Sequence, residues 1–235
     1  MEIEVYNATS YRLQHRLPVL SRRITDMTSC EHYRCIYLSN PISQCVHRLD
    51  VQGQSTRWEV ADRPQGLSVN GAHNLLVTCL SCVIKEFSTF GDLLREVRLP
   101  ETVANPWHAI QLTSGEFIVC HGDIRDALRR VSKISADGSR IVHSQPASDT
   151  GHQYGVPRHL AVDHNQFLFV ADITNRRVTL LSPTLDFVHE VVTADQLKWF
   201  PYRIFLDVRR KRLYVTDNEF EDRKYKSGRV VVLTI

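Results

Sequence analysis

The 235-residue sequence lacks several features that would assign a protein to a class at once. It contains no run of about 18 apolar residues, so we expect no membrane-spanning helix. Its charged start, MEIEVYN, differs from a signal peptide, and the sequence therefore predicts a cytoplasmic protein. It has no sustained 3.6-residue hydrophobic period and no Pro-, Gly- or Ser-rich linker, which favours one all-β domain over residues 1–235.

Recognisable enzyme motifs are also absent. The sequence contains no GxSxG, P-loop, HExxH or Rossmann pattern, which favours a protein without catalytic activity. Among its six cysteines, Cys79 and Cys82 form a single CxxC pair across an expected tight turn. Four of the six lie in or beside expected strands, where cysteine acts as a small buried thiol. We therefore expect no cofactor and no metal.

What the sequence does contain is a hairpin pattern, clearest in residues 167–181, FLFVADITNRRVTLL. Two apolar, strand-like runs flank a short polar turn that begins after Asp172. We expect the Asp172 carboxylate to accept hydrogen bonds from amides of the following turn. Asn175 is expected to adopt the left-handed conformation there, and Arg176 or Arg177 to pair with the carboxylate.

This pattern recurs with a period in the forties. The place of Asp172 is held by Asp217 in the last copy, RLYVTDNEF, and by small residues in the three earlier copies: Ser39, Cys79 and Cys120. In four copies a proline at the start of an apolar strand recurs with a similar spacing: Pro64, Pro106, Pro157 and Pro201. Five such units of several short strands predict a β-propeller, with units at approximately 21–61, 62–103, 104–154, 155–198 and 199–235.

The number of blades depends on residues 2–19. The first four units each hold four expected strands, whereas the fifth holds three. If the strand expected at 11–19 supplies the missing outer strand, a closed five-bladed ring results. Otherwise residues 2–19 are part of a sixth blade that lacks its inner strands, and we favour this incomplete six-bladed arrangement.

The fourth unit carries a family resemblance. VPRHLAVDHNQ followed by FVADITNRRVTLLS resembles an NHL repeat, in which a proline opens one strand and strand-Ala-Asp-x-x-Asn-x-Arg-Val follows. The fifth unit resembles it through Pro201, Asp217 and GRVVVL, and the first three do so loosely. The resemblance implies a six-bladed propeller. Such propellers act as binding platforms in ubiquitin-ligase and translational-repressor proteins, and as a catalytic scaffold in the lyase that completes peptide amidation.

Equivalent positions around the ring suggest a site. Two residues after the landmark proline the units carry Gly66, His108, His159 and Arg203, and Asp26 corresponds to them in the first unit. We expect these residues where the inner strands begin, at one mouth of the central channel, with four further side chains nearby: Trp107, His121, Arg158 and Tyr202. Channel lining without a specific ligand is the simplest interpretation, and a pocket for a polar or anionic ligand is the alternative. A metal held by the two histidines lacks an evident third ligand.

Basic residues gather in the expected turn formed by Arg209, Arg210, Lys211 and Arg212. A solvated turn is the simplest interpretation, and contact with RNA phosphates is the alternative. The net charge of +3 is too small to indicate a nucleic-acid protein on its own.

Three hypotheses about function follow. The favoured one is a non-catalytic platform for a protein or peptide partner, as in the substrate-recognition part of a ubiquitin-ligase-type protein. RNA binding through the basic turn is the second, and a metal- or small-ligand-dependent enzyme at the channel is the third. The sequence indicates neither the partner nor the oligomeric state.

Overall fold

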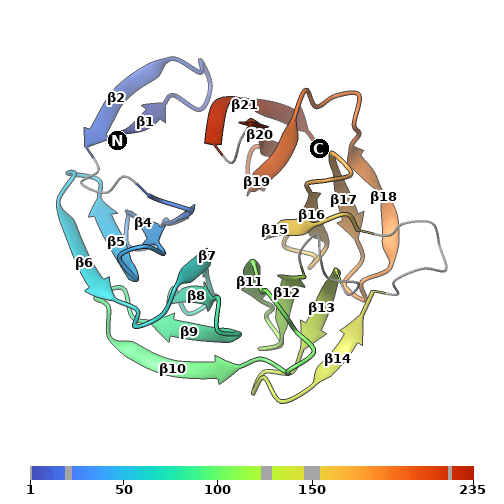
Figure 1. Cartoon of the computed structure of the whole chain (residues 1–235). Coiled ribbons are helices and arrows are strands. Elements are labelled where there is room, and N and C mark those ends of the chain that lie inside the picture. Colours follow the sequence, from blue (N-terminus) through green and yellow to red (C-terminus); the bar gives the residue numbers. More distant parts are fainter. Residues whose placement is uncertain (1, 19–22, 123–128, 146–153, 222–223) are drawn as a thin grey trace.

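The computed structural model describes residues 2–18, 23–122, 129–145, 154–221 and 224–235, and these residues form an all-β propeller. They contain 21 strands and no helix, so no helix that could cross a membrane occurs in the described part of the chain. Five sheets surround a central axis, and an additional pair of N-terminal strands lies between the last sheet and the first (Figure 1). The predicted fold class is therefore confirmed.

The five sheets are numbered as blades 1 to 5 in chain order. Blade 1 holds β3 (Asp26–Cys30), β4 (Cys35–Asn40), β5 (Cys45–Asp50) and β6 (Ser55–Glu59). Blade 2 holds β7 (Pro64–Val69), β8 (Leu75–Cys79), β9 (Val83–Phe87) and β10 (Leu93–Arg98). Blade 3 holds β11 (His108–Gln111), β12 (Phe117–His121), β13 (Arg130–Ile134) and β14 (Ile141–Ser144).

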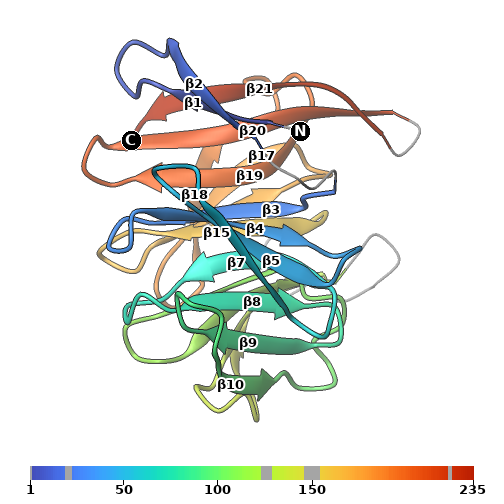
Figure 2. The ribbon, with the colours of Figure 1, turned by 90° about the vertical axis from the view of Figure 1, so that its left-hand side faces the viewer.

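The last two blades differ in size. Blade 4 holds β15 (Pro157–Val162), β16 (Leu168–Asp172), β17 (Arg177–Leu181) and β18 (Phe187–Val192). Blade 5 has only β19 (Phe200–Asp207), β20 (Arg212–Glu221) and β21 (Lys224–Thr234). All pairings are antiparallel, and the strands run roughly along the ring axis, so the turns gather at its two faces (Figure 2).

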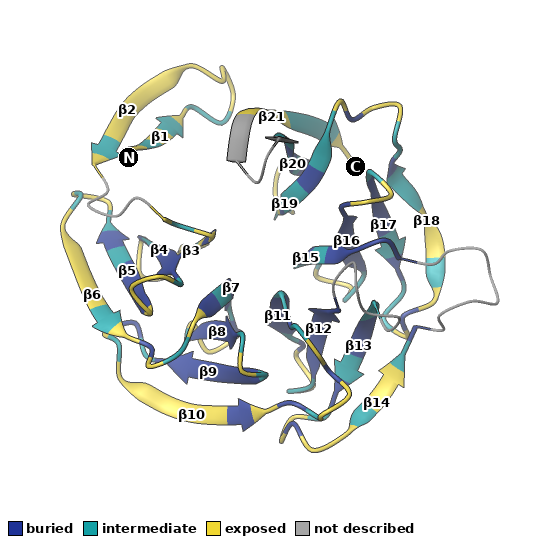
Figure 3. Cartoon of the chain, viewed as in Figure 1, coloured by how far each residue is buried: buried dark blue, intermediate teal, exposed yellow. Residues whose placement is uncertain are grey.

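Burial follows the radial position of each strand (Figure 3). In blade 2, β8 and β9 are buried along their whole length, whereas the charged outer strand β10 is mostly exposed. Two-sided burial of the middle strands explains their continuous apolar runs, and charges on the outer strand discourage pairing with other chains. Apolar side chains of neighbouring blades form one core in each of the four spaces between blades 1 to 5.

The N-terminal hairpin, β1 (Glu2–Tyr6) and β2 (Leu13–Pro18), lies outside these blades. It packs Ile3 and Leu17 against Leu38 of blade 1, and Arg212 of blade 5 donates a 2.9 Å hydrogen bond to the carbonyl of Ala8. β2 pairs with β1 and not with β21. The alternative in which residues 11–19 complete blade 5 is therefore wrong, and the hairpin remains a separate pair between blades 5 and 1.

Candidate functional site

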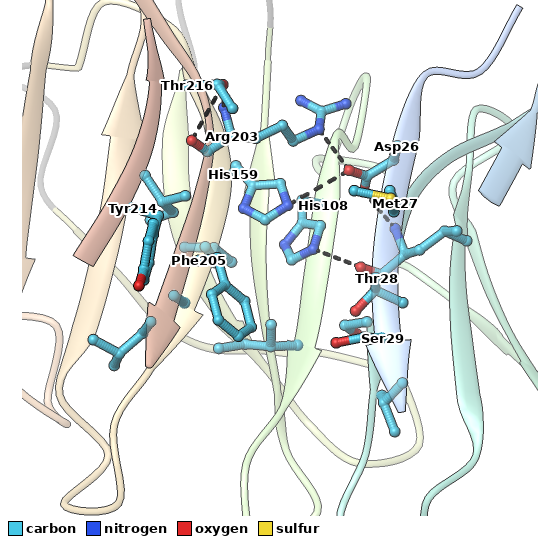
Figure 4. Close-up of a pocket in the computed structure, with 18 of the residues that line it drawn as sticks. Asp26, Met27, Thr28, Ser29, His108, His159, Arg203, Phe205, Tyr214 and Thr216 are labelled. Carbon is cyan, nitrogen blue, oxygen red and sulfur yellow. Dashed lines mark hydrogen bonds and ion pairs between the residues drawn. The ribbon is translucent and has the colours of Figure 1, made fainter. Parts of the chain in front are cut away.

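Four of the predicted ring positions meet at the channel (Figure 4). The Arg203 Nε atom lies 2.5 Å from Asp26 Oδ1, and His159 Nε2 lies 3.7 Å from the same oxygen. The rings of His108 and His159 stack with their centroids 3.9 Å apart. Each residue stands at or near the start of an inner strand, so repetition of the fold brings together side chains that are far apart in sequence.

Asp26 is the charged centre of this cluster and is fully buried. Its second oxygen accepts a 2.7 Å hydrogen bond from the Leu67 amide of blade 2. Arg203 also donates to the carbonyls of Thr25 and Tyr202. Burial opposes ionisation of Asp26, but Arg203 and His159 outweigh it and hold the pKa of this carboxyl well below its usual range. Asp26 and Arg203 therefore form an ion pair between blades 1 and 5.

The two histidines are uncharged at neutral pH. Burial lowers the pKa of His108 to about 3, and burial also lowers the pKa of His159. His108 Nε2 lies 3.0 Å from the Leu67 carbonyl, which only accepts, so the proton of the neutral ring belongs on Nε2. His108 Nδ1 and both ring nitrogens of His159 are buried without a hydrogen bond among the described residues. Unbonded buried nitrogens are rare in proteins, and of these three His159 Nε2 still lies near the Asp26 carboxylate.

Gly66, the ring residue of blade 2, has a packing role. A Cβ atom there would lie 2.4 Å from the Trp107 carbonyl oxygen and 2.9 Å from the His108 ring. Blade 3 can approach blade 2 this closely only because position 66 has no side chain. The glycine thus sets where the His108 ring stands.

The cluster closes one end of a cavity of about 730 Å³. Most of the remaining wall is apolar and comes from blades 1 and 5, as Figure 4 shows for Met27, Phe205 and Tyr214. Val230 completes that wall, and the Phe205 and Tyr214 rings are in tilted contact at 6.1 Å. Cavities of this size with a few converging polar groups are typical ligand sites. This wall was not predicted from the sequence, because apolar residues in strands are expected to be covered by the next sheet.

Three other predicted mouth residues form a separate stack. The guanidinium of Arg158 lies 3.5 Å from the centroid of the Trp107 ring and 5.6 Å from that of Tyr202. The indole nitrogen of Trp107 donates a 2.8 Å hydrogen bond to the Gly122 carbonyl. Consecutive blades 3, 4 and 5 contribute one residue each, and cation–π contact joins them beside the cavity.

His121 does not join either group. It is buried within blade 3, where its Nε2 atom lies 2.8 Å from the Ser132 hydroxyl of β13, and it does not line the cavity. Its position at the end of a second strand, rather than at the start of a first strand, explains the difference.

Asp172 has a structural role, but its partners differ from those expected. Its Oδ1 atom accepts hydrogen bonds from the amides of Gly155 and Val156, at 2.9 and 3.0 Å. These amides precede the first strand of blade 4, so the expectation that amides of the following turn bind the carboxylate is wrong. Arg177 Nε lies 3.2 Å from Oδ2 and is the pairing arginine.

The turn after Asp172 also differs in detail. Arg176, with a φ of 52°, takes the left-handed conformation that we expected at Asn175. The Asn175 side chain instead donates a 2.8 Å hydrogen bond to Asp172 Oδ2. The Arg176 guanidinium reaches away to the carbonyls of Ala194 and Leu197. A functional group on the asparagine, rather than its backbone freedom, thus explains its place in the motif.

Asp217 repeats the Asp172 arrangement in blade 5. Its two carboxylate oxygens accept the amides of Lys198 and Trp199 at 2.8 and 2.7 Å, and Arg229 Nε lies 2.7 Å away. Both aspartates therefore hold the segment that enters their own blade.

The basic turn lies at the end of β19 that is remote from Arg203. Arg209 pairs with Glu31 at 2.8 Å, and Arg210 pairs with Asp207 at 2.9 Å. Arg212 bonds the Ala8 carbonyl, while Lys211 adopts a φ of 51° in the turn itself. The turn thus forms ion pairs within the chain and is not continuous with the cluster.

Within the described part of the chain, Asp26, His108 and His159 form a group that could hold a metal ion. One ligand atom from each lies within 4.8 Å of the others. Asp26 therefore supplies the third ligand that was not evident from the sequence. The donor set suits a divalent cation such as zinc, but Arg203 already pairs with the carboxylate and adds an opposing positive charge.

Comparison with known proteins identifies the fold and no family. No family model matches the chain, and no curated protein matches it. A structure of a protein of unknown function from Bacteroides caccae matches with a TM-score of 0.73 and 15% identity, over 98% of this chain and 85% of that one. The nidogen/laminin complex matches with a TM-score of 0.71 and 15% identity, over 97% and 89%.

A lyase is among the other structures that match. Catalytically inactive virginiamycin B lyase from Staphylococcus aureus, solved with quinupristin, matches with a TM-score of 0.65 and 12% identity, over 92% of this chain and 70% of that one. Identities this low show the β-propeller fold alone. The resemblance to NHL repeats is not confirmed at the level of the family.

Proposed function

We propose that the chain is a non-catalytic binding platform whose central cavity takes a segment of a protein or peptide partner. The observation that carries the proposal is the cavity of about 730 Å³, polar at one end and apolar along blades 1 and 5. The cluster of Asp26, His108, His159 and Arg203 would face polar groups of the partner at one end, and the apolar wall would bind its side chains. Rigid blades hold this constellation in place, which lowers the entropic cost of binding.

Selection of peptides tests this proposal. A displayed peptide library is selected on the immobilised chain, and enriched peptides are then measured against His159→Phe, which keeps a ring but removes both nitrogens. We expect at least about a tenfold loss of affinity. Phe90→Glu, at a residue exposed outside the cavity, is the control and should bind normally. Equal binding to all three proteins, or no enrichment, would contradict the proposal.

A divalent metal site is a second candidate, favoured by the three converging ligand atoms of Asp26, His108 and His159. Melting temperatures with and without zinc chloride test it, because an ion that binds only the folded state raises the melting temperature. A rise in the unchanged chain that is absent in His108→Phe supports the site. No rise in either protein removes it.

We also propose, from the sequence, that the chain serves as the substrate-recognition part of a ubiquitin-ligase-type protein and that it is cytoplasmic. RNA binding is not favoured by the basic turn, since Arg209 and Arg210 are engaged with Glu31 and Asp207.

A further inference from the structure

The space between blades 5 and 1 differs from the other four. On each inner strand, the residue after the ring position faces the preceding blade, as its packing in the inter-blade cores shows for Leu67, Ala109, Leu160 and Ile204. These four are between 1% and 4% exposed. Met27 holds the same position in blade 1 and is 52% exposed. Blade 1 thus presents an inner-strand residue that no preceding blade covers.

The opposite wall of this space shows the same exposure. The next residue along each inner strand faces the following blade, and Ser68 and Ile110 are each 7% exposed there. Phe205 is the equivalent residue of blade 5 and is 57% exposed. The two uncovered walls face each other across one space, which we call the open slot and which Met27, Ile36, Phe205, Tyr214 and Val230 line.

The N-terminal hairpin closes the slot only at its outer side. β2 lies at the rim of the ring and β1 lies inside it, with no strand paired to the inner edge of β1 in the described chain (Figure 1). A second cavity of about 490 Å³ reaches from Val5 of β1 to Phe205 and shares Ser29 and Ile36 with the first. The hairpin therefore lies where the outer strands of a further blade would lie. The space between it and the axis is where the inner strands of that blade would lie.

Two ion pairs flank the slot: Arg203 pairs with Asp26 at one end, and Arg209 pairs with Glu31 at the other. Between them the walls are mainly apolar, so apolar side chains would cover them. The inner edge of β1 pairs with no strand of the described chain and can take a further one. An extended strand with apolar side chains meets both conditions.

We propose that the open slot binds an extended β-strand of a protein partner, which pairs its backbone with β1 and covers Met27 and Phe205 with apolar side chains. This rests on the proposed function, because the slot is the apolar part of the same cavity. It adds the conformation of the partner segment and the edge on which it is held.

A strand from the chain itself is a suitable probe. A fluorescein-labelled synthetic peptide of residues 167–171, FLFVA, is uncharged in its side chains and reproduces most of β16, whose Phe169 and Ala171 pack against the other wall of blade 5 in the intact ring. We expect saturable binding by fluorescence polarisation, at least about tenfold weaker in Met27→Glu and in Phe205→Glu. Both positions are exposed, so these variants should fold, and Phe90→Glu is the matched control.

Backbone pairing is tested with the same peptide N-methylated at alternate residues, which should bind at least about tenfold more weakly. The proposal that the open slot binds a strand would be contradicted if the methylated peptide bound as tightly as the unmethylated one. It would also be contradicted if Phe205→Glu bound the peptide as tightly as the unchanged chain, or if no saturable binding were seen. Light scattering that shows a dimer which Phe205→Glu dissociates would contradict it too, since a second copy would then be the occupant. If peptides from the library bind the unchanged chain but not His159→Phe, and the strand probe does not bind, the proposed function is supported and the strand-binding slot is not.

Discussion

Blades 4 and 5 differ from blades 1 to 3 in how the entering chain segment is held. Buried carboxylates, Asp172 and Asp217, each accept two backbone amides and an arginine in the later blades. The earlier blades have Ser39, Cys79 or Cys120 at that place, and none of these can accept as many bonds.

Blade 2 shows another arrangement of the entering segment. The amide before its landmark proline, that of Arg63, donates a 2.6 Å hydrogen bond to the side chain of its neighbour Asp62. A main-chain hydrogen bond from Leu80 to the Arg63 carbonyl, 3.0 Å long, ties the segment to the end of β8. The matching main-chain bond in blade 4 runs from Ile173 to Val156. In blade 4 the aspartate is thus an addition to a backbone link that blades 2 and 4 share.

The largest test of this comparison is Asp172→Ala. The change leaves two buried amides without their carboxylate, and it leaves Arg177, whose side chain is 11% exposed, with Glu190 as its remaining carboxylate partner. We expect the free energy of unfolding to fall by about 3–5 kcal/mol in urea titrations. Asp163→Ala removes a carboxylate that accepts two amides in a more exposed turn, and should cost much less. Equal losses would show that burial of Asp172 contributes nothing special.

Asp217→Ala should cost less, about 1–3 kcal/mol, in the same titration. The amides of Lys198 and Trp199 lose their acceptor in the same way. The side chain of Arg229, however, is 47% exposed, and water can solvate it. A loss as large as that of Asp172→Ala would mean that the arginine exposure does not set the difference.

Acid should destabilise the channel cluster. The folded state holds the pKa of His108 at about 3 and lowers that of His159, whereas unfolded histidines titrate near 6.5. Below about pH 6.5 these histidines therefore bind protons in the unfolded state but not in the native state. The free energy of unfolding falls as the pH falls. We expect His108 to contribute a loss of about 1 kcal/mol per pH unit between pH 6 and 4, and His159 to contribute a loss in the same direction.

His108→Phe and His159→Phe separate this contribution. Either change should reduce the slope of stability against pH, as measured by urea unfolding at several pH values. His189→Gln on the exposed outer strand β18 is the control and should leave the slope unchanged. An unchanged slope in both phenylalanine variants would show that the channel histidines accept protons in the folded state.

The repeats explain why much of the fold could be predicted from the sequence. The landmark proline and the landmark at the position of Asp172 recur with the same spacing, and this spacing defines the blade boundaries. Residues two positions after each proline therefore start equivalent inner strands, which all lie around the axis. This brought Asp26, His108, His159 and Arg203 to one site. His121 was misplaced, because the end of a second strand carries no such geometric constraint.

Contacts beyond one repeat could not be predicted in the same way. Met27 and Phe205 have the residue type expected of covered inner strands, and only the missing neighbour exposes them. The partners of Asp172 lie on the segment before its blade, since antiparallel pairing brings the end of β16 beside the start of β15. Local turn preferences favoured Asn175 for the left-handed position, but its side-chain bond to Asp172 determines where it stands.

The smallest expected effect concerns Cys120, which stands in blade 3 where blade 4 has Asp172. The thiol is fully buried, and burial raises its pKa, so it stays neutral and acts as a small apolar group. Cys120→Ala should therefore cost only about 1 kcal/mol of unfolding free energy, from the lost packing of one sulfur atom. Cys82→Ala, in a half-buried turn, should cost less still. A loss at Cys120 as large as that at Asp172 would mean that the cysteine also holds its entering segment, and the contrast between the two groups of blades would fail.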